Sequence, residues 1–312
     1  MIDTRTVLIL GAGASVPFGF PAGVTFLRQV LWCLGQDDLW QPPHFEREKV
    51  KDFRLALRDS GTESVDAFLE HRPEFVGIGK TAMAYVLLPC EKTGSLFDIE
   101  RTETNWYNEL FAKMKAPKEA FGDNNVSFVT FNYDRSLEQF LFTALCKLYN
   151  LDAPACAHTL ARIPITHVHG QLGLLPWQEH LPETRGPTFS RPPVLAYGQT
   201  QGIQDAIRAA ESIRIISDSI DDIEQDREFS KARQLLQEAD RVVFLGFRFH
   251  QQNVERLGIP NVFVHGEGRP KVFGCVYGME EPEREFVRSR YGVRHVLTCP
   301  DRAFLRKSGC LL

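Results

Sequence analysis

The stretch Thr6-Val7-Leu8-Ile9-Leu10-Gly11-Ala12-Gly13-Ala14-Ser15 joins a short β-prone run to a glycine-rich turn near the start of the chain. Because its apolar residues are continuous and do not alternate with polar ones, the run predicts a strand buried on both faces of a parallel sheet. The glycines allow a sharp turn and a close approach to a pyrophosphate, which the following helix N-terminus would also favour. A tight turn without a ligand is the alternative, but Ser15 and the strand before it favour phosphate.

Similar apolar runs recur along the chain and alternate with helical patterns. The strands are predicted at residues 6–10, 126–131, 165–169, 241–247, 261–264, 271–276 and 294–297. The helices are predicted at residues 26–34, 135–149, 201–213, 227–239 and 281–291. This alternation predicts an α/β fold, Rossmann-like, with a mostly parallel sheet and helices on both faces.

The interval between the first two predicted strands is too long for one crossover helix, since a βαβ unit usually takes about 30 residues. Spaced apolar positions predict helices within it at residues 52–58, 64–71, 81–88 and 105–115. We therefore expect an inserted helical module at residues 29–122 and a nucleotide-binding domain made of residues 1–28 and 123–312. Residues 172–193 contain five prolines and are predicted to form a long loop.

Composition excludes several classes of protein. A formal net charge of -4 over 312 residues offers no broad positive field, so direct nucleic-acid binding is not expected. No apolar run is long enough for a membrane span, and the N-terminal run is too short for a signal peptide. The seven cysteines are scattered without a CxxC pair, which excludes a zinc ribbon and predicts reduced thiols in a cytoplasmic protein, with no metal site.

Polar residues follow the second predicted strand, in the sequence VSFVTFNYD. Thr130, Asn132 and Asp134 stand at or just beyond its carboxyl end, where doubly wound sheets bind their ligands. The alternative is that Asn132 and Asp134 cap the helix that begins near Arg135.

Two later strand ends carry further candidates. In ITHVHGQLG, His169 precedes Gly170 and is suited to accept a proton near neutral pH, although either His167 or His169 is expected to be structural. In RVVFLGFRFHQQN, Gly246 ends a strand and is followed by polar residues up to Asn253. Such a glycine suits the passage of a dinucleotide's ribose or adenine, and an ordinary strand-to-loop glycine is the alternative.

Taken in order, GAGAS, TFNYD, HG and LGFRF resemble the sirtuin-like family, over roughly residues 6–253. The combination of TFNYD with HG is the most specific part. The sequence Ser64-Val65-Asp66-Ala67-Phe68-Leu69 resembles a helical motif of the family's bacterial defence branch.

The resemblance implies an NAD site without metal. Asn132 would orient the nicotinamide ribose or an attacking water, Asp134 would engage the carboxamide, and His169 would be the general base. The positions implied to bind the nucleotide are Gly11, Ala12, Gly13, Ser15, Thr130, Asp134, Gly246 and Asn253. Cleavage of the nicotinamide–ribose bond needs positioned polar groups and one base, which this set supplies.

Two departures from the family argue against deacetylation of a protein as the reaction. The four-cysteine zinc module of protein-deacetylating sirtuins has no counterpart, and Gly19-Phe20-Pro21-Ala22-Gly23 replaces their proline-aspartate-phenylalanine-arginine run. Water is then the expected acceptor, which makes the chain an NAD+ glycohydrolase that depletes NAD in anti-phage defence. The alternatives are a non-catalytic sensor of NAD or ADP-ribose and a zinc-free deacylase or ADP-ribosyltransferase.

The defence branch also implies partners and control. A homo-oligomer is expected, or a companion defence protein such as an ATPase or a nucleic-acid-guided protein. A constitutive NAD hydrolase would harm its host, so an inactive resting state is expected as well.

Overall fold

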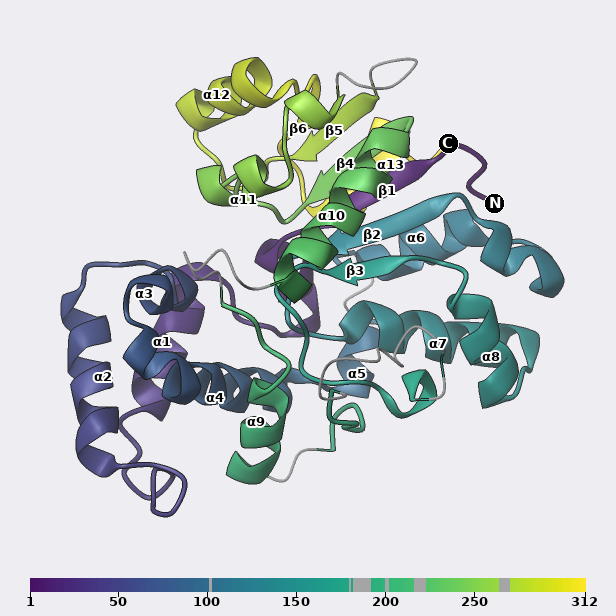
Figure 1. Cartoon of the computed structure of the whole chain (residues 1–312). Helices are drawn as coiled ribbons and strands as arrows, with labels where there is room; N and C mark the ends of the chain where they lie inside the picture. Colours follow the sequence, from purple (N-terminus) through teal and green to yellow (C-terminus); the bar gives the residue numbers. More distant parts are fainter. Residues whose placement is uncertain (101–102, 180, 182–191, 200–201, 216–222, 264–269) are drawn as a thin grey trace.

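The computed structural model of the chain describes residues 1–100, 103–179, 181, 192–199, 202–215, 223–263 and 270–312. The described strands form one parallel sheet in the order β3-β2-β1-β4-β5-β6 (Figure 1). These strands are β1 (Thr6–Leu10), β2 (Val126–Thr130), β3 (Ile165–His167), β4 (Arg241–Leu245), β5 (Lys271–Cys275) and β6 (His295–Leu297). This is the strand order of dinucleotide-binding folds, so the α/β, Rossmann-like prediction is confirmed.

The order of the strands reverses between β1 and β4, which are neighbours in the sheet. Leu10 is paired with Thr130 on one side and with Leu245 on the other, so the three central strands end at the same level. Ligands of open α/β sheets bind beyond the carboxyl ends of the strands at such a switch point. The glycine turn after β1 lies at this place.

Helices connect and cover the strands. The structure has α1 (Gly23–Cys33), α2 (Arg47–Asp59), α3 (Val65–His71), α4 (Val76–Leu87), α5 (Thr93–Leu96), α6 (Trp106–Met114), α7 (Ser136–Tyr149), α8 (Ala153–Leu160), α9 (Ile203–Ala210), α10 (Ile223–Glu238), α11 (Gln251–Arg256), α12 (Glu281–Tyr291) and α13 (Asp301–Ser308). The four helical segments predicted between residues 52 and 115 correspond to α2, α3, α4 and α6. Ser64, Asn105 and Asp152 cap the N-termini of α3, α6 and α8 by accepting a hydrogen bond from a backbone N–H of the first turn.

The strand predicted at residues 261–264 is wrong. Asn261–Phe263 forms a 3-10 helix, in which Val262 N–H donates to the carbonyl of Gly258 at 2.8 Å. Val262 and Phe263 are buried without pairing with another strand, which accounts for their apolar character. Residue 264 and much of the loop predicted at 172–193 lie outside the described residues, and within that loop Pro176–Gln178 forms a short 3-10 helix.

The two faces of the sheet bury separate cores. Leu8 and Leu10 of β1 face a large cluster that includes side chains of α1–α4, α6, α7 and α13. Val7 and Ile9 face a smaller cluster completed by α10, α11 and α12 (Figure 1). Since alternate residues of a strand point to opposite faces, the two sides of the ligand-binding edge receive different side chains.

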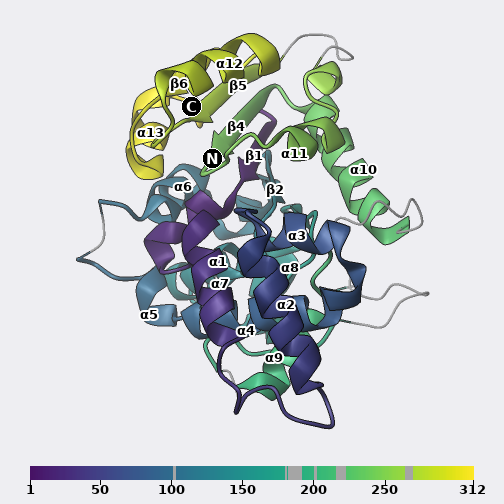
Figure 2. The same ribbon diagram turned by 90° about the vertical axis from the view of Figure 1, so that its left-hand side faces the viewer.

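The predicted insertion packs against the first face. Trp40 and Trp106 are fully buried in the same cluster as Leu8 of the sheet. Helices α1, α2 and α4 lie side by side, and α9 packs along α4 (Figure 2). The core of residues 29–122 is therefore continuous with that of the sheet.

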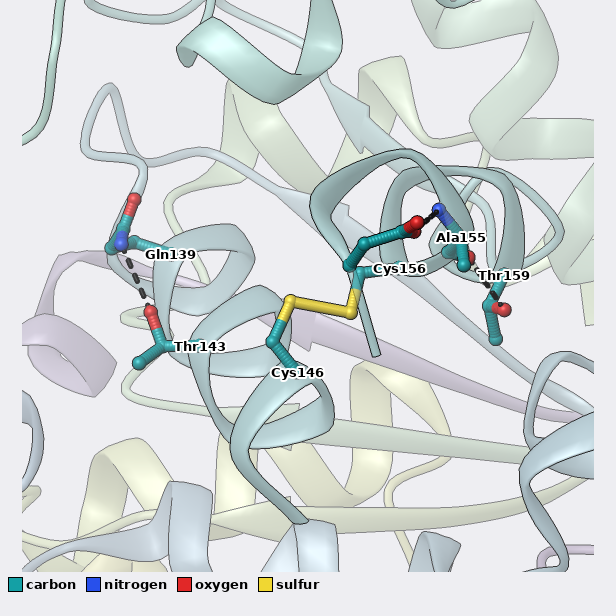
Figure 3. The surroundings of a disulfide bond; sticks show 7 residues. Gln139, Thr143, Cys146, Ala155, Cys156 and Thr159 are labelled. Atoms are coloured by element: carbon teal, nitrogen blue, oxygen red, sulfur yellow. Dashed lines mark hydrogen bonds between the residues drawn. A yellow bond between two sulfur atoms is a disulfide. The ribbon is translucent and has the colours of Figure 1, made fainter. Parts of the chain in front are cut away.

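A disulfide joins Cys146 of α7 to Cys156 of α8 (Figure 3). The expectation of reduced thiols is wrong for this pair. Asn150 ends α7 in the left-handed conformation (φ 52°), and the chain turns back into α8, so that two Cα atoms ten residues apart approach to 5.9 Å. The spacing of cysteines in the sequence does not reveal this helix hairpin. The other five cysteines, Cys33, Cys90, Cys275, Cys299 and Cys310, are free.

Within the described part of the chain, no helix combines the length and the apolar character that crossing a membrane requires.

Candidate functional site

The glycines of the predicted phosphate turn pack against the end of β4. Gly11 N–H donates to the carbonyl of Leu245 and Gly13 N–H to that of Gly246, each at 3.0 Å. A Cβ atom on Gly11 would lie 2.5 Å from the carbonyl oxygen of Gly246, and one on Gly246 (φ +58°) would lie 1.9 Å from the nitrogen of Ala14. The backbones of the two strand ends therefore touch at the switch point, and only glycine allows this. Ala12 is exposed beside them.

Asn132 lies against this turn. Its Nδ2 donates to the carbonyl of Gly11 at 3.0 Å and to Ser15 Oγ at 2.9 Å. Its backbone N–H donates to Thr130 Oγ1 at 3.1 Å. Because the carbonyl of Gly11 can only accept, the side-chain atom that bonds it must be the amide nitrogen, Nδ2. The other side-chain atom, Oδ1, is buried and has no hydrogen-bond partner among the described residues. A buried acceptor in this condition is a place where a donor on a ligand gains binding energy.

Asp134 is surrounded by hydroxyl donors. Ser15 Oγ donates to its Oδ2 at 2.6 Å, while Ser136 donates to its Oδ1 from both the hydroxyl and, at 3.1 Å, the backbone N–H. Tyr107 of α6 contacts the Ser136 hydroxyl at 2.7 Å. Burial raises the pKa of Asp134, and the bonds from Ser136 and Ser15 oppose that rise. Both oxygens of this carboxyl are satisfied within the protein, so Asp134 organises the turn.

His167 is bonded at both ring nitrogens. Its Nδ1 lies 2.9 Å from the carbonyl oxygen of Asn132, and its Nε2 lies 2.5 Å from Glu138 Oε1. Burial lowers the pKa of His167, but the Glu138 carboxylate and the Asn132 carbonyl outweigh it and leave the pKa raised. Sequence reasoning missed Glu138 and Tyr107. Glu138 follows Asp134 by four residues, about one helical turn, which is the signal that points to it.

His169 lies just beyond β3 and is surrounded by aromatic rings. Its ring is close to those of Phe131, Tyr133 and Phe229, with centroid separations of 5.3, 6.5 and 5.8 Å. Phe229 belongs to the core of the second face and Phe131 packs against it, whereas Tyr133 belongs to the core of the first face, so His169 lies at the sheet edge between the two clusters.

Asn253 and Arg256 of α11 complete the surroundings of His169. Burial and then the positive charge of Arg256 lower the pKa of His169 to about 4, against a hydrogen bond with the side chain of Asn253. The imidazole is therefore neutral at pH 7, and its burial and the Arg256 charge must be relieved before it becomes an effective base.

The described site residues thus form two groups. The first holds Ser15, Thr130, Asn132 and Asp134 beside the packed glycines Gly11, Gly13 and Gly246. The second joins His169 to Asn253. The sequence predicted that all would lie at the carboxyl edge of the sheet, but gave no signal of which hydrogen-bond partners each would take.

A small cavity lies beneath the first group, with a volume of about 10 Å³, which is space for about one water molecule. The polar side chains that line it belong to Ser15, Tyr107, Thr130, Asn132, Asp134, Glu138 and His167. The cavity is too small for a nucleotide. Apolar side chains, among them Leu10, Leu137 and Ile165, line the rest of the cavity.

No cluster of three or more histidine, cysteine, aspartate or glutamate side chains suited to a metal ion occurs within the described ranges. No protein-family model matches the chain, and no curated protein matches it either. Its function is therefore proposed from the geometry of the site.

Proposed function

We propose that this protein is an NAD+ glycohydrolase, which cleaves the nicotinamide–ribose bond to give nicotinamide and ADP-ribose. The observation that carries the proposal is the placement of Asn132, whose amide is bonded to the glycine turn while its Oδ1 has no partner in the described structure. The turn lies at the switch point of a sheet with the dinucleotide-binding strand order.

The residues suit the chemistry of that reaction. When the bond between ribose C1′ and the pyridinium nitrogen breaks, nicotinamide leaves with the bonding electron pair and C1′ becomes oxocarbenium-like. Water adds its oxygen to C1′ and loses a proton. Asn132 Oδ1 would accept a hydrogen bond from a ribose hydroxyl or from this water, and neutral His169 would accept the proton. A positioned base contributes about 100- to 10,000-fold in rate.

Catalysis requires a rearrangement from the described state. Asn132 and His169 are only 9% and 8% exposed, so a nucleotide reaches them only when the residues that cover them move. Phe229 of α10 lies against His169, and the guanidinium of Arg256 lies 5.3 Å from the centre of the Phe229 ring. This cover favours an inactive resting state. We propose that assembly of the chain with itself or with a companion protein moves the cover, and that NAD depletion serves anti-phage defence.

The test is incubation of the purified full chain with NAD+, alone and with candidate partner proteins, followed by chromatography of the products. Asn132→Ala and His169→Ala are expected to lower kcat at least about 100-fold. Asn125→Ala and His44→Ala replace exposed residues of the same types and are expected to keep full turnover. Failure to release nicotinamide under every condition, or full turnover by both site variants, contradicts the proposal.

A nucleotide sensor without catalysis is the second candidate. The low pKa of His169 favours it, because an imidazole with a pKa of about 4 is a weak base at pH 7 and a binding site needs no base. Calorimetry distinguishes the two functions. A sensor binds NAD or ADP-ribose and leaves NAD+ intact over hours, whereas a hydrolase releases heat continuously as product accumulates.

A further inference from the structure

Glu138 and His167 form a buried pair directly behind the site. Their side chains are 3% and 9% exposed, and Nε2 of the imidazole is 2.5 Å from the carboxylate. The hydrogen bonds of the described structure link neither residue directly to the glycine turn. Their common point of contact with the site is the carbonyl of Asn132.

The partners of His167 determine its charge. Nδ1 faces a carbonyl oxygen, which can only accept, so Nδ1 carries a proton, and the charge of Glu138 at Nε2 raises the pKa of His167 and so favours a second proton there. The titratable groups facing it are Glu138 of α7, Asp134 after β2 and Tyr107 of α6, which line the same cavity. The described residues lining this cavity include no lysine or arginine. His167 is therefore the cation that balances the buried carboxylates.

The hydrogen bond from His167 to the Asn132 carbonyl matters because Asn132 lies beyond the end of the sheet. The β2–β3 pairing ends at Thr130 opposite His167, and the last ladder bond runs from Val168 N–H to the carbonyl of Thr130 at 3.0 Å. Past that point, Thr130 Oγ1 binds the N–H of Asn132 and the His167 ring binds its carbonyl. Side chains thus replace the missing strand neighbour and hold the backbone of Asn132 at both its N–H and its carbonyl.

We propose that His167, held as an imidazolium by Glu138, is a positioning residue that fixes the Asn132 backbone and so aims its amide at the glycine turn. This inference rests on the proposed function for its catalytic consequence. The positioning itself is a property of the protein without substrate, and it has a test of its own.

The test compares His167→Gln and the milder Glu138→Gln with the wild type by NMR of the full chain labelled at asparagine and tryptophan. The NMR signal of the Asn132 side-chain amide is identified as the one that is missing from the spectrum of Asn132→Asp. In both variants the exchange of its amide protons is expected to accelerate at least tenfold. The indole N–H of Trp106, which donates to the carbonyl of Ala14 at 2.8 Å, serves as the internal control and is expected to stay protected.

Unchanged exchange at Asn132 in both variants overturns the proposal, as does equal acceleration at Trp106, which would mean general loosening. Where turnover is measurable, kcat is expected to fall about tenfold or more with KM little changed, and Glu138→Gln is expected to shift the alkaline limb of kcat to lower pH. A wild type without NAD+ turnover contradicts the proposed hydrolase only, because the exchange measurement still decides the role of His167.

Discussion

Arg135 and Glu91 form an ion pair in which neither side chain is exposed, with Nη2 and Oε2 2.5 Å apart. Glu91 comes from the predicted insertion and Arg135 from the turn that follows Asp134. Arg135 also donates to the carbonyls of Leu174 and Leu195, at 3.2 and 2.7 Å. One guanidinium therefore joins the insertion, the site turn and the segment after β3.

Loss of the Glu91 charge should destabilise the protein strongly. Glu91→Gln leaves Arg135 buried without a counter-charge, which costs about 3–5 kcal/mol. The matched control is Glu281→Gln, since Glu281 is 65% exposed in its pairs with Arg284 and Arg288 and its loss should change stability far less, because water screens an exposed pair. Urea unfolding measures both. Equal losses in the two variants would contradict a special role for the buried pair.

Gly246→Ala should disrupt the switch point. The added Cβ would meet the backbone of Ala14 and would also sit at a φ of +58°, so the expected cost exceeds about 3 kcal/mol. Gly61→Ala is the control, because Gly61 has φ +70° with nothing within 4 Å of its Cβ position and should lose only about 1–2 kcal/mol. Thermal unfolding ranks the two variants. A Gly246 variant as stable as the Gly61 variant would show that the strand ends can separate without cost.

The stability of the protein should depend on pH through His169. The pKa of His169 in the folded protein is about 4, below the ordinary value of 6.5. Between pH 4 and pH 6.5 this histidine is therefore protonated in the unfolded chain and neutral in the folded one. The contribution is complete above pH 6.5 and is lost as the pH falls toward 4, on the order of 3 kcal/mol in total. His169→Phe should flatten the stability curve in this window relative to the wild type. His44→Phe, at an exposed position, should leave the slope as it is.

Thiol counting should reveal the Cys146–Cys156 disulfide. Alkylation in denaturant followed by mass spectrometry is expected to modify five cysteines without reductant and all seven after reduction. Cys146→Ser should lower stability by about 2–4 kcal/mol. Cys90→Ser, which removes a free thiol, provides the comparison. Modification of all seven cysteines before reduction would refute the bridge.

Local patterns in the sequence predicted much of the fold. The continuous apolar run of β1 and those of β2 and β4 mark buried parallel strands, because burial on both faces leaves no room for polar alternation. The exception is instructive. Val262 and Phe263 are also buried, yet residues 261–263 form a 3-10 helix with local hydrogen bonds, because burial alone does not distinguish a strand from a tight helical turn.

The sequence by itself determined the sheet, the turn at Gly11 and the level at which Asn132 and His169 leave their strands, since these depend on residue type and spacing along one element. Only the tertiary structure decided that Asn132 faces Gly11 while His169 faces Phe229, and that His167 takes its partner from α7. The physical reason is distance along the chain. Side chains separated by tens of residues meet only after helices from several segments have packed on the sheet. The local sequence pattern around each residue does not predict which of these distant side chains it will contact.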